Sequence, residues 1–91
     1  MDYGPDDEID YGGPVTPYRQ LAGIVRARIA RGDWAAGRAI ASESQLVQQY
    51  GLARSTVRRT IALLAEEGDV FVVAGRGTYV SQPAPTEPPA E

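Results

Sequence analysis

Arginine is the side chain through which this sequence could do chemistry. All nine basic residues are arginines, between positions 19 and 76. A guanidinium group presents a planar fork of N–H donors that matches phosphate oxygens and the O6/N7 edge of guanine. One candidate cluster of arginines with small polar neighbours consists of Arg54, Ser55, Thr56, Arg58 and Arg59. A second candidate site is Arg76 with Gly77, in a glycine-rich turn.

The sequence lacks the residues that most enzymes use for catalysis. The chain has no histidine and no cysteine, which removes the commonest general base, the commonest metal ligand and any disulfide. The sequence also shows no serine–base pair, no phosphate-binding loop and no carboxylate pair in a plausible cleft. We therefore expect no enzyme activity, no catalytic residues, no cofactor and no metal.

The formal net charge of −3 conceals an uneven distribution along the chain. Residues 1–14 carry five acids and no base, and residues 81–91 carry two acids and no base. Residues 15–80 carry nine arginines against five acids. A basic body therefore lies between two acidic ends, which is compatible with a polyanionic partner.

Composition divides the chain into three parts. Residues 1–15 mix Asp, Gly, Pro and isolated Tyr without an apolar period, and residues 82–91 are rich in Pro and acidic. Such segments bury too little apolar surface to offset the entropy of ordering. We predict that both are disordered acidic tails flanking one domain at residues 16–81. Because no apolar run approaches about 20 residues and no signal-peptide pattern is present, we expect a cytoplasmic protein without membrane contact.

Capping signals and helical periodicity predict a first helix that ends at about Arg31. Thr16 can cap its start, and Pro17 has a backbone preset for the first helical position. Apolar residues then recur at helical spacing until Gly32, which can adopt the left-handed conformation that ends a helix.

Two more helices follow, separated by a short turn. Ser42 with Gln45 three residues later forms a capping-box pattern, and Gly51 supplies a stop about two turns further on. The third helix begins near Arg54 or Ser55. Two helices joined by a turn of about three residues that contains Gly are typical of the helix-turn-helix.

The third helix has an apolar side and a basic side. Its apolar residues recur at i, i+4 and i+7, and they are Val57, Ile61 and Leu64. On a helical wheel Ser55 and Arg59 lie nearly opposite Val57, and Arg58 lies on the flank. The first two turns therefore offer the basic, small side chains that a helix needs to enter a major groove about 12 Å wide.

The last predicted elements are two strands. Residues 70–73 form a β-branched and aromatic run, residues 74–77 a glycine-rich turn, and residues 78–80 a second strand. The order helix, helix, helix, strand, strand predicts an α+β fold of the winged helix-turn-helix class, with a two-stranded hairpin as the wing.

Each arginine signal by itself has an ordinary explanation. Arg58 and Arg59 could make the helix soluble and pair with Glu66 or Glu67, and Arg76 could be a charged turn residue. The combination of an arginine-bearing helix with an arginine-bearing wing favours recognition of double-stranded DNA.

Residues 17–80 resemble the DNA-binding domain of GntR-family transcriptional regulators. The matching stretches are PYRQLAGIVRARIARGDWAAG, SESQL, YGLARSTVRRTIALLAEEG and GRGTYV. The resemblance implies that Arg54, Thr56 and Arg58 contact base edges or phosphates and that Ser55 contacts phosphate. It also implies that Arg76 with Gly77 lets the wing touch the minor groove or the backbone.

The sequence departs from the family pattern at three positions. Ser44 replaces an arginine that usually contacts DNA, and it offers a hydrogen bond without charge. Ala53 replaces the Ser or Thr that usually caps the third helix, so Ser55 could take over as the cap. Ala41 replaces a proline and loosens the entry to the second helix.

The favoured function is a sequence-specific DNA-binding transcriptional regulator, expected to be a repressor that joins the nucleoid when bound to DNA. One module covers only about 600–1,000 Å² of DNA, so we expect a weak or DNA-assisted homodimer. Arg26, Arg28, Arg31 and Arg38 are further candidates for phosphate contact. Only eleven residues follow Val80, so we expect no small-molecule effector site in this chain.

Two alternatives remain open at this point. The winged helix could serve as a protein–protein interaction module, or as an accessory regulator modulated by its acidic tails, with an interface centred on Trp34 or Phe71. The acidic N-terminal tail could also fold over the arginine cluster and compete with DNA.

Overall fold

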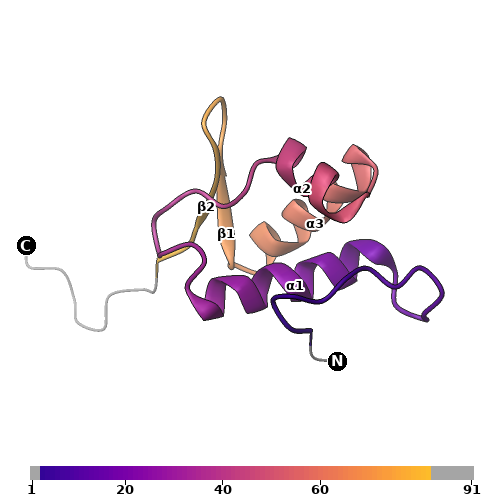
Figure 1. Cartoon of the computed structure of the whole chain (residues 1–91). Helices are drawn as coiled ribbons and strands as arrows, with labels where there is room; N and C mark the ends of the chain where they lie inside the picture. Colours follow the sequence, from indigo (N-terminus) through magenta and orange to yellow (C-terminus); the bar gives the residue numbers. More distant parts are fainter. Residues whose placement is uncertain (1–2, 83–91) are drawn as a thin grey trace, which may run out of the picture.

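Three helices and one hairpin follow each other along the chain (Figure 1). The computed structural model describes residues 3–82, and the disorder predicted for residues 1–2 and 83–91 concerns positions outside this range. The elements are α1 (Pro17–Arg31), α2 (Glu43–Tyr50), α3 (Arg54–Glu66), β1 (Val70–Val73) and β2 (Gly77–Val80). The predicted α+β winged helix-turn-helix is confirmed. Within residues 3–82 no helix has the length and apolar character needed to cross a membrane.

The ends of α1 and α2 follow the predicted signals, except that Thr16, at the N-cap of α1, forms no side-chain capping hydrogen bond. Pro17 occupies the start of α1, and Gly32, with φ of 95°, donates its N–H to the carbonyls of the last turn. At α2 the Ser42 hydroxyl accepts from the Gln45 N–H at 3.1 Å, while the Gln45 side chain accepts from the Ser42 N–H at 2.8 Å. Gly51, with φ of 67°, ends α2. The capping box thus satisfies two N–H groups that a helix start leaves without partners.

Helix α3 starts at Arg54 with Ala53 in the capping position. Ala53 has no side-chain oxygen, so no capping hydrogen bond forms from this residue to an N–H of the first turn of α3. Ser55 lies inside the first turn, so it does not replace the missing cap.

The core lies between α1, α2 and α3 and is closed by the base of the hairpin. Helix α3 contributes Val57, Ile61 and Leu64, all nearly or fully buried. The buried Thr60 hydroxyl donates to the backbone carbonyl of Tyr18 or of Thr56, at 2.9 and 3.1 Å. The other buried apolar side chains are Leu21, Ala22, Ile24, Val25, Ile40, Leu46, Leu52, Val70 and Val80. This burial decides which side of α3 faces outward.

The sheet has more partners than the predicted hairpin. β1 and β2 pair antiparallel with Val70 opposite Val80. On the other edge of β2, Ala39 forms an isolated bridge with Tyr79, and the Ile40 N–H donates to the Thr78 carbonyl at 2.9 Å. The connection between α1 and α2 therefore lies alongside β2, a pairing too short to leave an alternating pattern in the sequence.

Residues 3–15, named here the N-terminal arm, follow a defined path along α1, whereas the sequence predicted disorder. The Gln20 side chain hydrogen-bonds the backbone of Asp10 and Val15, and Ile9 packs against the core. The prediction considered only apolar periodicity. The arm is held instead by single anchoring contacts, which have no period.

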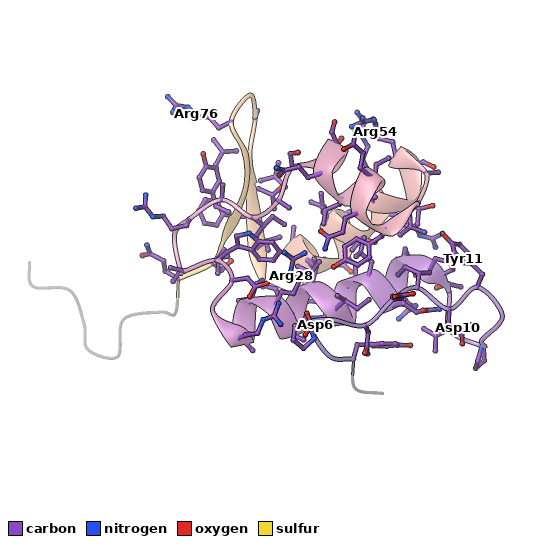
Figure 2. The ribbon with its side chains drawn as sticks, viewed as in Figure 1. Asp6, Asp10, Tyr11, Arg28, Arg54 and Arg76 are labelled. Carbon is purple, nitrogen blue, oxygen red and sulfur yellow. The ribbon has the colours of Figure 1, made fainter. Side chains whose placement is uncertain are left out.

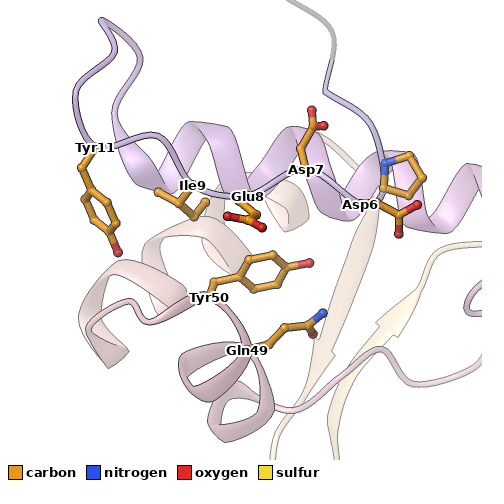
Figure 3. Close-up of a pocket in the computed structure, with 8 residues that line it drawn as sticks. Asp6, Asp7, Glu8, Ile9, Tyr11, Gln49 and Tyr50 are labelled. Carbon is orange, nitrogen blue, oxygen red and sulfur yellow. The ribbon is translucent and has the colours of Figure 1, made fainter.

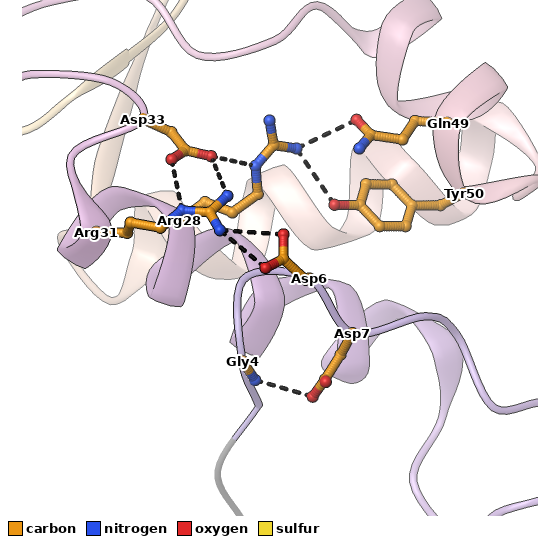
Figure 4. Close-up of polar contacts among 8 residues, drawn as sticks. All are labelled: Gly4, Asp6, Asp7, Arg28, Arg31, Asp33, Gln49 and Tyr50. Carbon is orange, nitrogen blue, oxygen red and sulfur yellow. Dashed lines mark hydrogen bonds and ion pairs between the residues drawn. The ribbon is translucent and has the colours of Figure 1, made fainter.

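A compact group of charges closes the carboxyl end of α1 (Figure 4). Asp33 accepts from Arg28 Nε at 2.8 Å and from Arg31 Nε and Nη2, each at 2.8 Å. The hydrogen bonds from Arg31, and then those from Arg28, hold the pKa of Asp33 well below its ordinary value of 3.8. The Arg28 guanidinium also covers the ring of the half-buried Trp34, 4.3 Å from its centroid.

Asp33→Asn is expected to lower the melting temperature at pH 7, because the two arginines lose their shared carboxylate. The lowered pKa means that this contribution is complete above about pH 4 and is lost as the pH falls through the folded-state pKa. The difference in melting temperature between wild type and variant should therefore begin to shrink below about pH 4 and keep shrinking as the pH falls further. Glu66→Gln is the control, since Glu66 forms no ion pair with any residue between positions 3 and 82. A difference that stays constant from pH 7 to pH 2 would contradict this assignment.

Candidate nucleic-acid interface

The first two turns of α3 present basic side chains to solvent. Val57, Thr60 and Ile61 face the core, so the residues between them point outward. The side chain of Arg58 is 67% exposed and that of Arg54 49% exposed. The remaining predicted residues of this helix are Arg54, Ser55 and Arg59, which are exposed, and Thr56, which is half-buried.

Glu43, at the start of α2, connects two of these arginines. Its Oε1 lies 3.2 Å from Arg54 Nη1 and 3.3 Å from Arg58 Nε. Arg54 Nη2 also donates to the Ser44 hydroxyl at 3.1 Å. The structure thus joins Ser44 to the arginine cluster as a hydrogen-bond partner. From the sequence we missed Glu43 because we considered only basic side chains on α3. The available signal was the position of Glu43 in the first turn of α2, eleven residues before Arg54.

Arg59 and the acids near the end of α3 do not form the ion pairs that a purely solubilising role of the arginines would favour. The Arg59 guanidinium lies over the Tyr18 ring, 4.1 Å from its centroid. Glu67 forms its ion pair with Arg26, not with an arginine of α3. Pairing of Arg58 or Arg59 with Glu66 or Glu67 is therefore absent among residues 3–82.

The wing carries its arginine at the tip. Gly75 and Gly77 have φ of 77° and 135°, a region that side chains with Cβ rarely adopt, and the Arg76 N–H donates to the Val73 carbonyl at 2.9 Å. Arg76 is exposed. Figure 2 shows Arg54 and Arg76 at the same end of the molecule, while Asp6 and Asp10 lie along α1 on the other side.

The arginines of α1 are engaged elsewhere. Arg26 pairs with Glu67 and with Asp69, and its pKa is raised chiefly by the hydrogen bond to Asp69. Burial alone would lower the pKa of Arg28, but hydrogen bonds to Asp33 and Tyr50 outweigh it and raise the pKa. Both guanidinium groups therefore have acceptors within the fold.

Arg31 and Arg38 complete the four arginines considered for phosphate contact. Arg31 shares Asp33 with Arg28 and also contacts Asp6 of the arm at 3.0 Å. Arg38 is exposed and forms no ion pair within the part of the chain that the structure describes. Of the four arginines, only Arg38 is both exposed and without an acidic partner in that range.

A helix-turn-helix followed by a two-stranded hairpin defines the winged helix-turn-helix class. In this chain the second helix of the motif exposes arginines, and the hairpin carries one at its tip. The family model described as bacterial regulatory proteins, gntR family, matches residues 17–80. The chain belongs to the gntR family of bacterial regulatory proteins.

Curated relatives and solved structures agree with this placement. The mannosyl-D-glycerate transport/metabolism system repressor MngR of Escherichia coli is 40% identical over 65 residues, which are 71% of this chain and 27% of that protein. The HTH-type transcriptional repressor NagR of Bacillus subtilis is 32% identical over 82% of this chain and 31% of that protein. The chain therefore spans less than a third of the length of these relatives.

Two solved structures carry the same fold. YtrA from Sulfolobus acidocaldarius, a GntR-family transcription factor, superposes with a TM-score of 0.75 at 27% identity, covering 85% of this chain and 81% of that one. The DNA-binding domain of AraR in complex with operator ORE1 gives a TM-score of 0.72 at 30% identity, covering 81% of this chain and 98% of that one.

Ala53→Ser is expected to stabilise the fold, because the extended backbone at this position (φ −64°, ψ 149°) suits a serine that accepts from the first turn of α3. The gain should be about 1 kcal/mol, or roughly 4–8 °C in melting temperature. Thermal denaturation followed by circular dichroism measures it. Ala62→Ser, on the exposed middle of α3, is the matched control and should give no gain; equal effects of both substitutions would refute the capping explanation.

Proposed function

We propose that this chain is a sequence-specific double-stranded DNA-binding transcriptional regulator that acts as a repressor. The exposure of Arg54, Arg58 and Arg76 carries the proposal. Arg54 and Arg76 lie at one end of the molecule (Figure 2), and Arg58 shares Glu43 with Arg54. The curated names of MngR and NagR describe repressors, and the AraR domain was solved with operator DNA. These relatives support the same role for this chain.

In the proposed complex the amino-terminal half of α3 enters the major groove. Arg54, Thr56 and Arg58 contact base edges or phosphates, and Ser55 contacts phosphate. Guanidinium groups suit guanine O6 and N7, and a major groove admits one helix. Arg59 flanks this surface, and its stacking on Tyr18 limits the orientations it can adopt.

The wing and α2 supply the surrounding contacts. Arg76 reaches the backbone or the minor groove, and Gly77 allows the close approach of the hairpin tip. Ser44 offers its hydroxyl where many relatives would place a charge, so this module relies on fewer phosphate contacts. No catalytic, metal or cofactor role is proposed for any of these residues.

A single module of this size covers too little DNA for high affinity, since one such domain buries about 600–1,000 Å². We propose a weak or DNA-assisted homodimer on half-sites about one helical turn apart. The site of action is the cytoplasm, at the nucleoid when bound, and no small-molecule effector is assigned to this chain.

The alternative is a protein–protein interaction module or accessory regulator. The exposed wing residues Phe71, Val72 and Val73 favour it, because apolar side chains with 37–58% exposure gather on one strand. Such an interface depends weakly on salt, whereas DNA binding through about five phosphates weakens by roughly tenfold or more between about 50 and about 200 mM salt.

Arg58→Ala is expected to reduce the preference for the selected DNA site by about 1–3 kcal/mol. The measurement is fluorescence anisotropy of a labelled duplex, selected by the protein from a random library, against a scrambled duplex at two salt concentrations. Arg19→Ala is the control, since it removes an equal charge from α1, beside the groove lined by Gly23 and Leu63.

The two variants separate the outcomes. Loss of preference in Arg58→Ala but not in Arg19→Ala supports the proposed interface. Equal small losses in both would mean that only overall charge matters, and enrichment of no duplex at low salt would favour the protein-interaction alternative.

A further inference from the structure

The N-terminal arm lies before residues 17–80, the range that matches the family. It carries Asp6, Asp7, Glu8 and Asp10, yet it runs along α1 and away from the end that bears Arg54 and Arg76 (Figure 2). Within residues 3–15 the structure therefore does not show the acidic segment covering the arginine cluster. A different role follows from what the arm touches.

Gln20 is the central anchor of the arm. The residue is 2% exposed, and within residues 3–82 all the hydrogen bonds of its side chain go to the arm. Oε1 accepts from the Asp10 N–H at 2.8 Å, and Nε2 donates to the carbonyls of Asp10 and Val15 at 2.7 Å each. A buried amide left without such partners costs about 1–3 kcal/mol, so α1 is built to be covered by the arm.

Gly23 is the second anchor, in the middle of α1. A Cβ at this position would lie 2.5 Å from Cδ2 and 3.2 Å from Cβ of Tyr3. Glycine inside a helix costs about 0.5–1 kcal/mol relative to alanine, and here it allows the Tyr3 ring to pack directly on the helix backbone. Asp6 adds an exposed ion pair with Arg31 on the same helix.

The far end of the arm reaches the turn between α2 and α3. The Tyr11 hydroxyl donates to the Gly51 carbonyl at 3.1 Å, and Ile9 packs beside it against the core. Figure 3 shows Tyr11, Ile9 and Glu8 following one another past Tyr50 at the end of α2. Gly51 lies three residues before Arg54, and the intervening Ala53 provides no side-chain cap.

We infer that the N-terminal arm is a strap that positions α3, the proposed recognition helix. Tyr11 is the contact of this strap with the turn between α2 and α3. The arm is tied to α1 by Gln20 and Gly23, and it holds the Gly51 carbonyl just before α3, where the usual cap is missing. The strap thereby orders the start of the helix that carries Arg54 and Arg58. This inference rests on the proposed function, and Tyr11 is a positioning residue, not a DNA contact.

The direction in which DNA affinity changes when the arm is released distinguishes a strap from a segment that competes with DNA. Release of a competing acidic segment strengthens DNA binding, whereas release of a strap weakens it. Deleting the arm would mix the two effects, because four acids leave with it. Variants that keep the charge are therefore required.

Gly23→Ala and Tyr11→Phe meet this requirement. Gly23→Ala displaces Tyr3 while favouring the helix locally, and Tyr11→Phe removes only the hydrogen bond to Gly51. Gly12→Ala is the matched control in the arm, since a Cβ there meets Asp10 Oδ1 at an ordinary 3.6 Å. All are measured well below the melting temperature, so that a lower stability alone does not alter the fraction folded.

We expect Gly23→Ala and Tyr11→Phe to weaken binding to the selected duplex by about three- to tenfold. Binding to the scrambled duplex and the salt dependence of binding stay unchanged, because neither substitution alters the charge of the protein. Amide hydrogen exchange should accelerate in both variants at Gly51, Thr56 and Val57, whose N–H groups donate to the carbonyls of Val47 and Ala53. Exchange in the arm should accelerate in Gly23→Ala. Gly12→Ala should match wild type.

Three results would overturn the strap. They are affinities within twofold of wild type for both variants, tighter binding by either variant, and unchanged exchange at Gly51, Thr56 and Val57. Wild type that binds no duplex would overturn the proposed function and the strap together, whereas wild-type binding with unaffected variants overturns the strap alone.

Discussion

The packing of the apolar side of α3 against α1 is the constraint on which the other features depend. Val57, Ile61 and Leu64 are buried at helical spacing, and burial of each such side chain contributes about 1.5–3 kcal/mol. Rotating α3 about its axis would expose these residues and bury arginines. The direction in which Arg54 and Arg58 point is therefore set by packing of the core, before any DNA is bound.

Acids are distributed so that they engage arginines away from the wing and largely spare those near it. Arg26, Arg28 and Arg31 on α1 each have a carboxylate partner. Arg76 has none within residues 3–82. Glu43 is the exception, because it lies among Arg54 and Arg58 and restricts both side chains. In a chain with a formal charge of −3, the arginine at the wing tip thus has no acidic partner in that range, while Arg54 and Arg58 share one.

The sequence predicted the features that rest on local rules. The capping box at Ser42, the glycine ends of α1 and α2, and the hairpin all depend on residues within a few positions of each other, so their patterns are legible. The arm and the third sheet partner at Ala39 depend on contacts between distant residues. Gln20 in particular reads as an ordinary polar helix residue until Asp10 and Val15 are placed beside it.

The site was predictable to the same extent. The exposed residues of α3 follow from helical periodicity, whereas the bridging role of Glu43 requires knowing how α2 crosses α3. Which of these side chains contact DNA stays a prediction.

β2 is hydrogen-bonded on both edges, to β1 and to the segment that precedes α2. The base of the wing is consequently held from two sides. These hydrogen bonds tie the hairpin to the connection that leads to Ser42 and Ser44. Two surfaces that are far apart in sequence would then meet a ligand with their relative geometry already set, and the entropy of aligning them is lost during folding instead of binding.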